Sequence, residues 1–271
     1  MAIELAGVAY RYAGTSRECL LGIDLRLEPG RVLGIAGANE SGKTTLCLVV
    51  SGFAPAVVGG RLAGSATIDG TATVAIPPHR LAQHCGLLFQ DASTQLTGTT
   101  ATVFEEVAFG PCSLGLAVPE VVERVGWALS AVGIEDLAPR HPSRLSGGQA
   151  QLVALASVLA LRPGYLILDE PTSELDPAGT ALVADALVRV AAETGAGIML
   201  VEHKTDVLAR VADEVAVLAA GQIALRGSAA EVLADPRLPD LGVEPPAGIR
   251  LRREVAAVGA AWPVELGEGV A

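Results

Sequence analysis

Lysine and aromatic residues are scarce in this chain of 271 residues. Phe, Tyr and Trp make up 3% of it, so Val, Ala, Leu and Ile must fill the core. Lysine occurs only at Lys43 and Lys204, while an excess of acidic residues gives a formal net charge of -11. That balance argues against general binding of nucleic acid or anionic lipid, because both require a basic face. It leaves phosphate binding open, since a few backbone N–H groups and one lysine are sufficient.

Long hydrophobic runs and paired cysteines are also missing. The longest apolar run, Leu152–Leu161, ends at Arg162 and Pro163 and is far shorter than the roughly 18 residues that a membrane-spanning helix needs. The N-terminal segment has no basic start followed by an apolar core, so we predict no signal peptide. The cysteines are Cys19, Cys47, Cys85 and Cys112. Their spacing is not that of a metal site and predicts reduced thiols, as in the cytoplasm.

Short β-like runs alternate with helical runs along most of the chain. The β-like runs are Ile3–Tyr12, Leu20–Leu27, Arg31–Ala36, Ala66–Ile68, Gly86–Phe89, Leu166–Leu168, Ile198–Val201 and Val215–Leu218. The helical runs are Thr44–Val50, Val103–Phe109, Glu120–Val132, Gln149–Leu161, Ala178–Ala192 and Ala229–Ala234. This order predicts an α/β fold in which helices cover the faces of a parallel sheet. The mostly helical segment from about residue 102 to 161 is expected to be an insertion into that core.

A glycine-rich loop follows the apolar run Val32–Ala36 and precedes a helix. Its residues are Gly37, Ala38, Asn39, Glu40, Ser41, Gly42, Lys43 and Thr44, which match G-x-x-x-x-G-K-[ST] in full. In this context the loop curls so that successive N–H groups face phosphate oxygens, and the helix adds its positive N-terminal end. We expect Lys43 to bridge the β- and γ-phosphates of ATP and Thr44 to ligate Mg²⁺. The predicted ATP contacts extend to Thr45.

Two acidic residues end a second apolar run, Tyr165–Leu168. Ligands bind at the carboxyl ends of strands in open α/β sheets, and adjacent strand residues point to opposite sides. Asp169 is therefore expected to hold Mg²⁺, and Glu170 to polarise the water that attacks ATP. The alternative is that they are two solvated acids at a strand end. It is less favoured because a phosphate loop lies upstream in the sequence.

A second set of small residues begins the apolar helix near Leu152. Leu145, Ser146, Gly147, Gly148 and Gln149 place free N–H groups at a helix N-terminus, which is an anion-binding arrangement. One nucleotide rarely needs two such cradles from one chain. We therefore expect this one to bind the ATP of a partner subunit.

Together these motifs resemble the nucleotide-binding domain of ABC transporters, over roughly residues 3–235, and LSGGQ is that family's signature. The resemblance implies a P-loop NTPase (RecA-like) core over about residues 1–90 and 163–235, an N-terminal antiparallel β subdomain, and an inserted α-helical subdomain over about 91–162. Residues 236–271 are rich in Pro and Gly. They form a tail that we expect to be poorly ordered or a small docking segment, with a basic cluster at Arg250, Arg252 and Arg253.

The resemblance also assigns roles to four single residues. It implies that His203 contacts the γ-phosphate, that Gln90 reaches Mg²⁺ and water and senses the membrane partner, and that Asp176 lies in the loop facing the opposite subunit. Tyr12 is implied to stack on adenine, although it or Tyr10 could instead be packing in the core or at an edge. A lone histidine after a strand is more often structural, and only its place in this ordered set favours the phosphate role.

Residues 87–116 look like those of the energy-coupling-factor and cobalt/nickel-uptake ATPases, with Gln95-Leu96 and the run Val107–Pro111. Val103, Phe104, Val107 and Ala108 form an apolar stripe at helical spacing. Part of this stripe must pack on the core, and the resemblance implies that it also forms a groove for a helix of a membrane partner. Two departures from the family pattern are Glu40, where Gly or Ser is common, and Lys204, which follows the histidine and could loosen a local contact.

The expected function is therefore that of an ATP-hydrolysing subunit at the cytoplasmic face of a membrane. It would pair with a second ABC ATPase, identical or paralogous, and act on separate transmembrane permease subunits, with ATP and Mg²⁺ as cofactors and without nucleic acid. Resemblance to the uptake systems implies a vitamin or a transition-metal cation such as cobalt or nickel as cargo. The alternatives are a soluble ABC-type ATPase of translation or DNA repair, which usually carries two cassettes or long heptad arms, and a regulatory module without catalysis.

Overall fold

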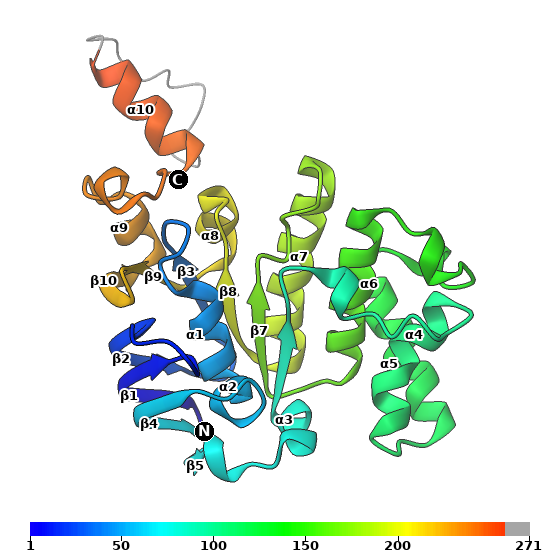
Figure 1. The fold of residues 1–271 in the computed structure, drawn as a ribbon. Helices are drawn as coiled ribbons and strands as arrows, with labels where there is room; N and C mark the ends of the chain where they lie inside the picture. Colours follow the sequence, from blue (N-terminus) through cyan, green and yellow to red (C-terminus); the bar gives the residue numbers. More distant parts are fainter. Residues whose placement is uncertain (258–271) are drawn as a thin grey trace.

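The computed structural model describes residues 1–257 and contains two sheets (Figure 1). A four-stranded antiparallel sheet has the order β2-β1-β4-β5, and a six-stranded sheet has the order β10-β9-β3-β8-β7-β6. The first contains β1 (Ile3–Arg11), β2 (Leu20–Leu27), β4 (Arg61–Ile68) and β5 (Thr71–Ala72). The second contains β3 (Val32–Ala36), β6 (Cys85–Leu88), β7 (Tyr165–Asp169), β8 (Gly197–Val201), β9 (Glu214–Ala219) and β10 (Gln222–Ser228). Only β10 is antiparallel to its neighbour in the larger sheet.

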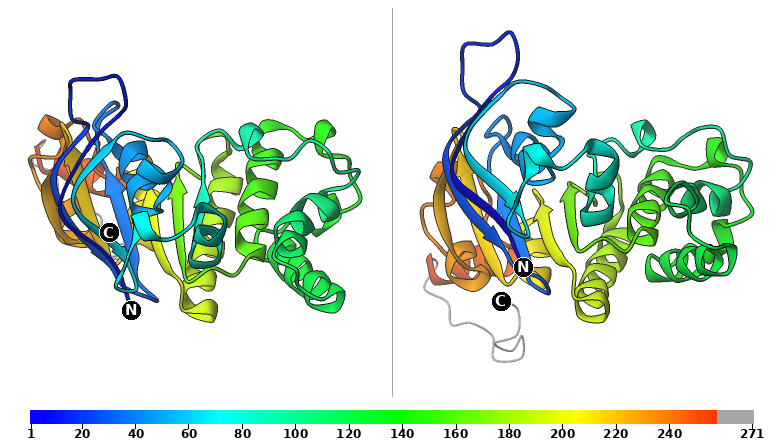
Figure 2. Two further views of the ribbon diagram at one scale, coloured as in Figure 1. Left: turned by 60° about the horizontal axis from the view of Figure 1, so that its bottom comes forward. Right: turned by 90° about the horizontal axis from the view of Figure 1, so that it is seen from below.

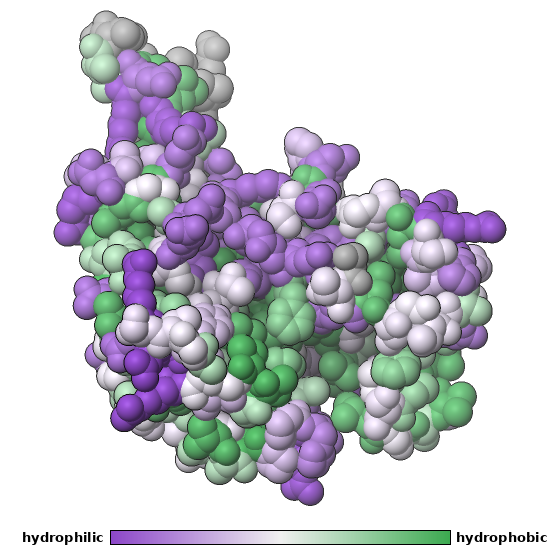
Figure 3. Space-filling view, in the orientation of Figure 1, coloured by the Kyte–Doolittle hydropathy of each residue, from purple (hydrophilic) through white to green (hydrophobic). Residues whose placement is uncertain are grey.

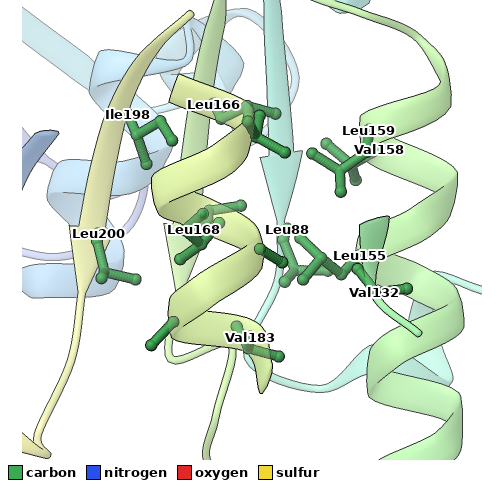
Figure 4. Packing of buried hydrophobic residues seen from close by; sticks show 14 of the residues in the cluster. Leu88, Val132, Leu155, Val158, Leu159, Leu166, Leu168, Val183, Ile198 and Leu200 are labelled. Atoms are coloured by element: carbon green, nitrogen blue, oxygen red, sulfur yellow. The ribbon is translucent and has the colours of Figure 1, made fainter. Parts of the chain in front are cut away.

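Side chains of the larger sheet alternate between two hydrophobic clusters. In β7, Leu166 and Leu168 enter one cluster, while Tyr165 and Ile167 enter the other. The first cluster lies against α6 (Gly147–Ala160) and α7 (Pro177–Thr194), as Figure 4 shows for Leu166, Leu168 and their neighbours. The second joins the sheet to α1 (Lys43–Val50) and the antiparallel sheet. Burial on both faces explains why these strands are continuous apolar runs.

The remaining helices extend the core on either side. They are α2 (Phe53–Ala56), α3 (Pro78–His84), α4 (Val103–Ser113), α5 (Val118–Ala131), α8 (Thr205–Val211), α9 (Ala229–Leu233) and α10 (Ala247–Ala257). Helices α4, α5 and α6 make the helical lobe that projects beyond the sheet edge in both views of Figure 2. The predicted α/β core, β subdomain and helical insertion are confirmed. Helices α3 and α8 were not indicated by the sequence pattern.

The described part of the tail packs on the core and then forms a helix. Leu238 is fully buried and Val243 is 5% exposed. The Thr205 hydroxyl donates to the Glu244 carbonyl at 2.8 Å, and the Ala247 amide donates to the Asp206 carboxylate at 2.9 Å. The core contacts therefore continue past residue 235. The three clustered arginines lie in α10, and residues 258–271 lie outside the described residues.

None of the helices within residues 1–257 is both long enough and apolar enough to cross a membrane.

Candidate functional site

Four neighbouring parallel strands bring the predicted catalytic residues to one edge of the sheet. Strands β3, β8, β7 and β6 lie side by side. The phosphate loop follows β3, Gln90 follows β6, Glu170 follows β7 and His203 follows β8. Residues from four separate parts of the sequence therefore meet at the carboxyl ends of the strands, which is where ligands bind in sheets of this kind.

The phosphate loop is wrapped closely around its own lysine. The Lys43 ammonium donates to the carbonyls of Gly37 and Ala38, both at 2.9 Å, and its residue is only 6% exposed. Gly37 has φ +157, and a Cβ there would come within 2.3 Å of the Leu218 carbonyl oxygen, so only glycine fits. Burial lowers the pKa of Lys43, and the nearby charges of Glu170 and Asp169 partly offset this. The loop holds its one cation pointing inward at the place predicted for phosphate.

A cleft of about 490 Å³ lies over this loop. Its lining includes the predicted residues Asn39, Glu40, Gly42, Lys43, Thr44, Thr45, Gln90 and Glu170. It also includes Arg17, Glu18, Cys19, Ala220 and Gly221, which the sequence did not indicate. These come from the β1–β2 connection and the β9–β10 turn, and only the folded sheets bring them to the loop. The cleft is the expected size for a nucleotide.

Glu170 is held between two of the predicted residues. The Gln90 amide donates to one carboxylate oxygen at 3.1 Å, and His203 Nε2 lies 3.0 Å from the other. Glu170 has φ +52, an uncommon conformation for a non-glycine residue, and its amide donates to the Val201 carbonyl at 3.0 Å. Backbone strain of this kind persists where the surroundings fix it. The three residues, 80 and 33 positions apart in sequence, therefore form one polar group, of which Gln90 and Glu170 line the cleft.

Asp169, the preceding residue, is far more buried than Glu170. It is 2% exposed and its Oδ1 has no hydrogen-bond partner. Burial raises the pKa of Asp169, against the lowering effects of the Thr44 hydroxyl and of Lys43. A buried carboxylate oxygen without a partner is costly, and this one fits a cation ligand that the protein itself does not supply.

We expect Asp169→Asn to stabilise the nucleotide-free protein and to abolish the predicted ATP hydrolysis. Because burial raises the pKa of Asp169, the ionised side chain destabilises the folded state above that pKa. The neutral amide should therefore add about 1–3 kcal/mol at pH 8, or ~2–4 °C of melting temperature per kcal/mol. The gain should shrink as pH falls towards the ordinary carboxyl pKa of 3.8. Thermal unfolding from pH 4 to 8 measures this, with Asp185→Asn on the surface as control. A lower melting temperature for Asp169→Asn at pH 8 would contradict it.

The two N-terminal tyrosines, Tyr10 and Tyr12, differ in how deeply they are buried. Tyr10 is fully buried, whereas Tyr12 is half-buried and its hydroxyl lies 3.1 Å from the Thr45 hydroxyl. The two rings pack edge to face with centroids 5.1 Å apart. Tyr10 therefore belongs to the core, and Tyr12 stands next to the end of the phosphate loop. Stacking of Tyr12 on adenine stays a prediction.

The signature residues start α6 and face solvent. The Ser146 hydroxyl accepts from the Gln149 amide at 3.3 Å, and the Gln149 side chain accepts from the Ser146 amide at 3.1 Å, which is a capping box. Ser146 and Gly147 are exposed. Asp176 is also exposed and caps α7 by accepting from the Gly179 amide at 2.7 Å. Across the described residues, neither Asp176 nor any of Ser146–Gln149 lines the cleft.

Comparison with known proteins decides the family. The family described as ABC transporter matches residues 20–173, more than half of the chain. The chain belongs to the ABC transporter family. The nickel import ATP-binding protein NikO of Rhodobacter capsulatus is 41% identical over 238 residues, covering 86% of this chain and 91% of that protein. The energy-coupling factor transporter ATP-binding protein EcfA1 of Latilactobacillus sakei is 35% identical over 264 residues, covering 97% of this chain and 91% of that protein.

A solved structure supports the same grouping. That of cbiO1 from Clostridium perfringens, described as part of the ABC transporter complex cbiONQ, superimposes with a TM-score of 0.74 at 30% identity. It covers 95% of this chain and 98% of that one. The chain is accordingly an ATP-hydrolysing ABC subunit of the energy-coupling-factor and cobalt/nickel branch. The alternative of a soluble ATPase in translation or DNA repair is not favoured by any of these relatives.

The apolar stripe of this ABC ATPase lies mostly inside the helical lobe. Val103 and Val107 are fully buried and Ala108 is 8% exposed, while Phe104 is partly buried against the same cluster. The core packing expected for part of the stripe is confirmed for Val103, Val107 and Ala108, which lie in the same buried cluster as α6. The groove for a helix of a membrane partner stays a prediction. The exposed apolar side chains of the lobe are instead Phe109, Val118 and Val122, which are 51%, 75% and 50% exposed.

Lys204, the residue after His203, does not loosen the ABC fold locally. The Lys204 ammonium donates to the Thr172 carbonyl at 2.7 Å, to the Leu175 carbonyl at 3.3 Å and to the Thr180 hydroxyl at 3.0 Å. The expectation that Lys204 could loosen a local contact is therefore not met, because its ammonium makes three hydrogen bonds. The other departure, Glu40, has φ +61 and lines the cleft without disturbing the loop.

Proposed function

We propose that this ABC ATPase drives uptake of a vitamin or a transition-metal cation, such as cobalt or nickel, through separate membrane subunits. Support comes from the nickel import and energy-coupling-factor relatives, which resemble the chain over 86% and 97% of its length. The motif Gln95-Leu96 adds a structural reason, because the Gln95 side chain bonds the Phe89 amide at 3.1 Å and the Leu87 carbonyl at 2.9 Å. It thereby fixes the strand end that carries Gln90.

The observation that carries the hydrolytic role is the Glu170 carboxylate between Gln90 and His203. A water near that carboxylate would lose its proton to Glu170 as its oxygen approaches the γ-phosphate. His203 and Lys43 are placed to stabilise the negative charge that develops on the phosphate oxygens. Lys43 would exchange its two carbonyl contacts for phosphate oxygens when ATP enters.

The residues present fit a bound Mg²⁺. Thr44, Asp169 and Gln90 would hold it, since the unpartnered Asp169 oxygen lies among oxygen donors of the type that Mg²⁺ prefers. When bound, the ion neutralises charge on the β- and γ-phosphates.

The site is completed by a second ABC ATPase subunit. Ser146, Gly147, Gly148 and Gln149 lie outside the cleft of their own chain at the start of α6, where Ser146 and Gly147 are exposed. We infer that they bind the γ-phosphate of ATP held by the partner, so that two subunits enclose two ATP molecules. Closure assembles the charge-stabilising groups, and hydrolysis lets the pair reopen.

The helical lobe is the surface proposed to meet the membrane subunits at the cytoplasmic face. Phe109 is more than half exposed in a chain with 3% aromatic residues, and Figure 3 shows hydrophobic residues on the α4–α5 lobe. An exposed apolar patch on a protein surface marks an interaction site, and we propose that Phe109, Val118 and Val122 belong to one. Opening and closing of the ATPase pair would move this lobe and the permease helix docked on it.

We expect Phe109→Asp to uncouple the ATPase from its membrane subunits. The new charge must be desolvated on docking, so co-purification from detergent-extracted membranes should fall about tenfold or more. ATP hydrolysis by the isolated subunit should stay unchanged, because Phe109 lies outside the cleft. Val188→Asp is the matched control, since Val188 is 45% exposed on α7, which is not one of the helices that carry Phe109, Val118 and Val122. Equal recovery of Phe109→Asp and wild type would rule out this docking surface.

A further inference from the structure

His203 is flanked by two charged residues that both hold the same loop, residues 171–176. Glu202 is 2% exposed and accepts from the Thr172 amide at 3.1 Å and from the Thr172 hydroxyl at 2.6 Å. Its other oxygen accepts from the amides of His203 and Lys204, at 3.1 and 3.4 Å. One buried carboxylate thus joins the backbone around His203 to the start of the loop.

Lys204 holds the rest of the loop from the opposite flank. Its three bonds, to the carbonyls of Thr172 and Leu175 and to the Thr180 hydroxyl, use all three N–H groups of the ammonium. The loop and the first turn of α7 are therefore fixed to the end of β8 through a single side chain. Hydrogen bonds to a charged donor of this kind are roughly twice as strong as neutral ones.

The loop that Lys204 holds, residues 171–176, contacts both Glu170 and the signature. It directly follows Glu170, whose carbonyl accepts from the Ser173 amide at 3.2 Å and from the Ser173 hydroxyl at 3.0 Å. Further along, Glu174 lies against the signature, since a Cβ on Gly148 would come within 3.1 Å of the Glu174 carbonyl. The loop ends at Asp176. A shift of this segment must therefore move Glu170, the signature or both.

We propose that Lys204 is a positioning residue for ATP hydrolysis. Lys204 ties residues 171–176 to the strand end that carries His203. It thereby couples the positions of Glu170 and His203 to the position of the loop that faces the second subunit. This proposal rests on the paired arrangement described under the proposed function. We assign Lys204 no part in binding ATP, because its three N–H groups are all used by Thr172, Leu175 and Thr180.

Kinetics of Lys204→Met test this role. The side chain keeps its length and loses its donors, so kcat should fall about tenfold or more, in line with the cost of small misplacements, while ATP binding to the isolated subunit stays within about twofold. Lys204→Arg should recover most of the turnover. Arg210→Met is the control, because Arg210 lies two turns on in α8 and pairs with Asp185 on the surface. Wild-type kcat in Lys204→Met, or equal losses of kcat and ATP affinity, would overturn the proposal.

Thr180→Val provides an independent test if Lys204→Met does not fold. It removes one acceptor of the ammonium and should lower kcat about two- to threefold, with no further loss when combined with Lys204→Met, since both changes break one contact. Unchanged kcat in Thr180→Val, or additive losses in the pair, would contradict the inference.

Dimer formation separates this proposal from the proposed function. In a Glu170→Gln background, ATP should drive pairing of subunits, and adding Lys204→Met should weaken that pairing about tenfold by analytical ultracentrifugation. If Glu170→Gln alone never pairs, the paired site is wrong. If it pairs and Lys204→Met pairs equally well, the paired site stands and the role of Lys204 is wrong.

Discussion

Replacing Glu170 with Gln is expected to reduce ATP turnover by about 10²–10⁴-fold, the usual contribution of a positioned general base. The amide keeps the shape of the side chain and can still contact Gln90 and His203, which now bracket the carboxylate at 3.1 and 3.0 Å. It cannot accept a proton from water. ATP binding should therefore survive, and the ATP-bound pair should accumulate because it cannot reopen.

Single-turnover hydrolysis and size analysis in the presence of ATP measure the two effects. Glu193→Gln is a suitable control, because Glu193 lies near the end of α7 and contacts Trp127 at 3.2 Å, outside the cleft. Near-normal turnover in Glu170→Gln would show that another group takes the proton.

Ser146→Arg is expected to have the second large effect, a loss of about 10²-fold or more in turnover. Ser146 is exposed and outside the cleft, so a bulky side chain there leaves the phosphate loop of its own chain untouched. In a two-subunit site it would collide with the partner's phosphate and remove donors needed in the transition state. ATP binding to the isolated subunit should remain at the wild-type level.

The substitution also removes the N-cap of α6, which costs about 1 kcal/mol. The helix should persist because Val153, Leu155 and Leu159 anchor it in the core. A melting temperature within a few degrees of wild type would confirm that the lost turnover is not unfolding. Loss of ATP binding together with turnover would instead place the signature in the site of its own chain.

Contiguous motifs were the most predictable part of this molecule. The phosphate loop and the Asp169–Glu170 strand end each combine a local sequence with a local structure, so short-range pattern was enough to place them. Tyr10 and Tyr12 have similar sequence surroundings, and only their different burial in the folded sheet distinguishes them.

Gln90 and His203 could be assigned only by resemblance, because nothing near them in sequence shows that they face Glu170. Their convergence comes from the order of β6, β7 and β8 in the sheet. The apolar stripe could not be divided between core and groove for a related reason: helical spacing shows that a face is apolar, but not whether it meets solvent or α6. The contacts of Lys204 with residues 172–180 were likewise invisible, since they depend on where the loop after β7 turns.

Mixing two inactive variants tests most directly whether each ATP site is shared between subunits. Lys43→Ala has an intact signature and a defective phosphate loop, and Ser146→Arg has the reverse. A mixed pair would contain one complete site, so an equal mixture should recover up to about a quarter of wild-type turnover, as random pairing gives half mixed dimers with one of two sites each. A mixture as inactive as its components, or a monomeric Ser146→Arg protein that hydrolyses ATP at full rate, would contradict a site completed by a second subunit.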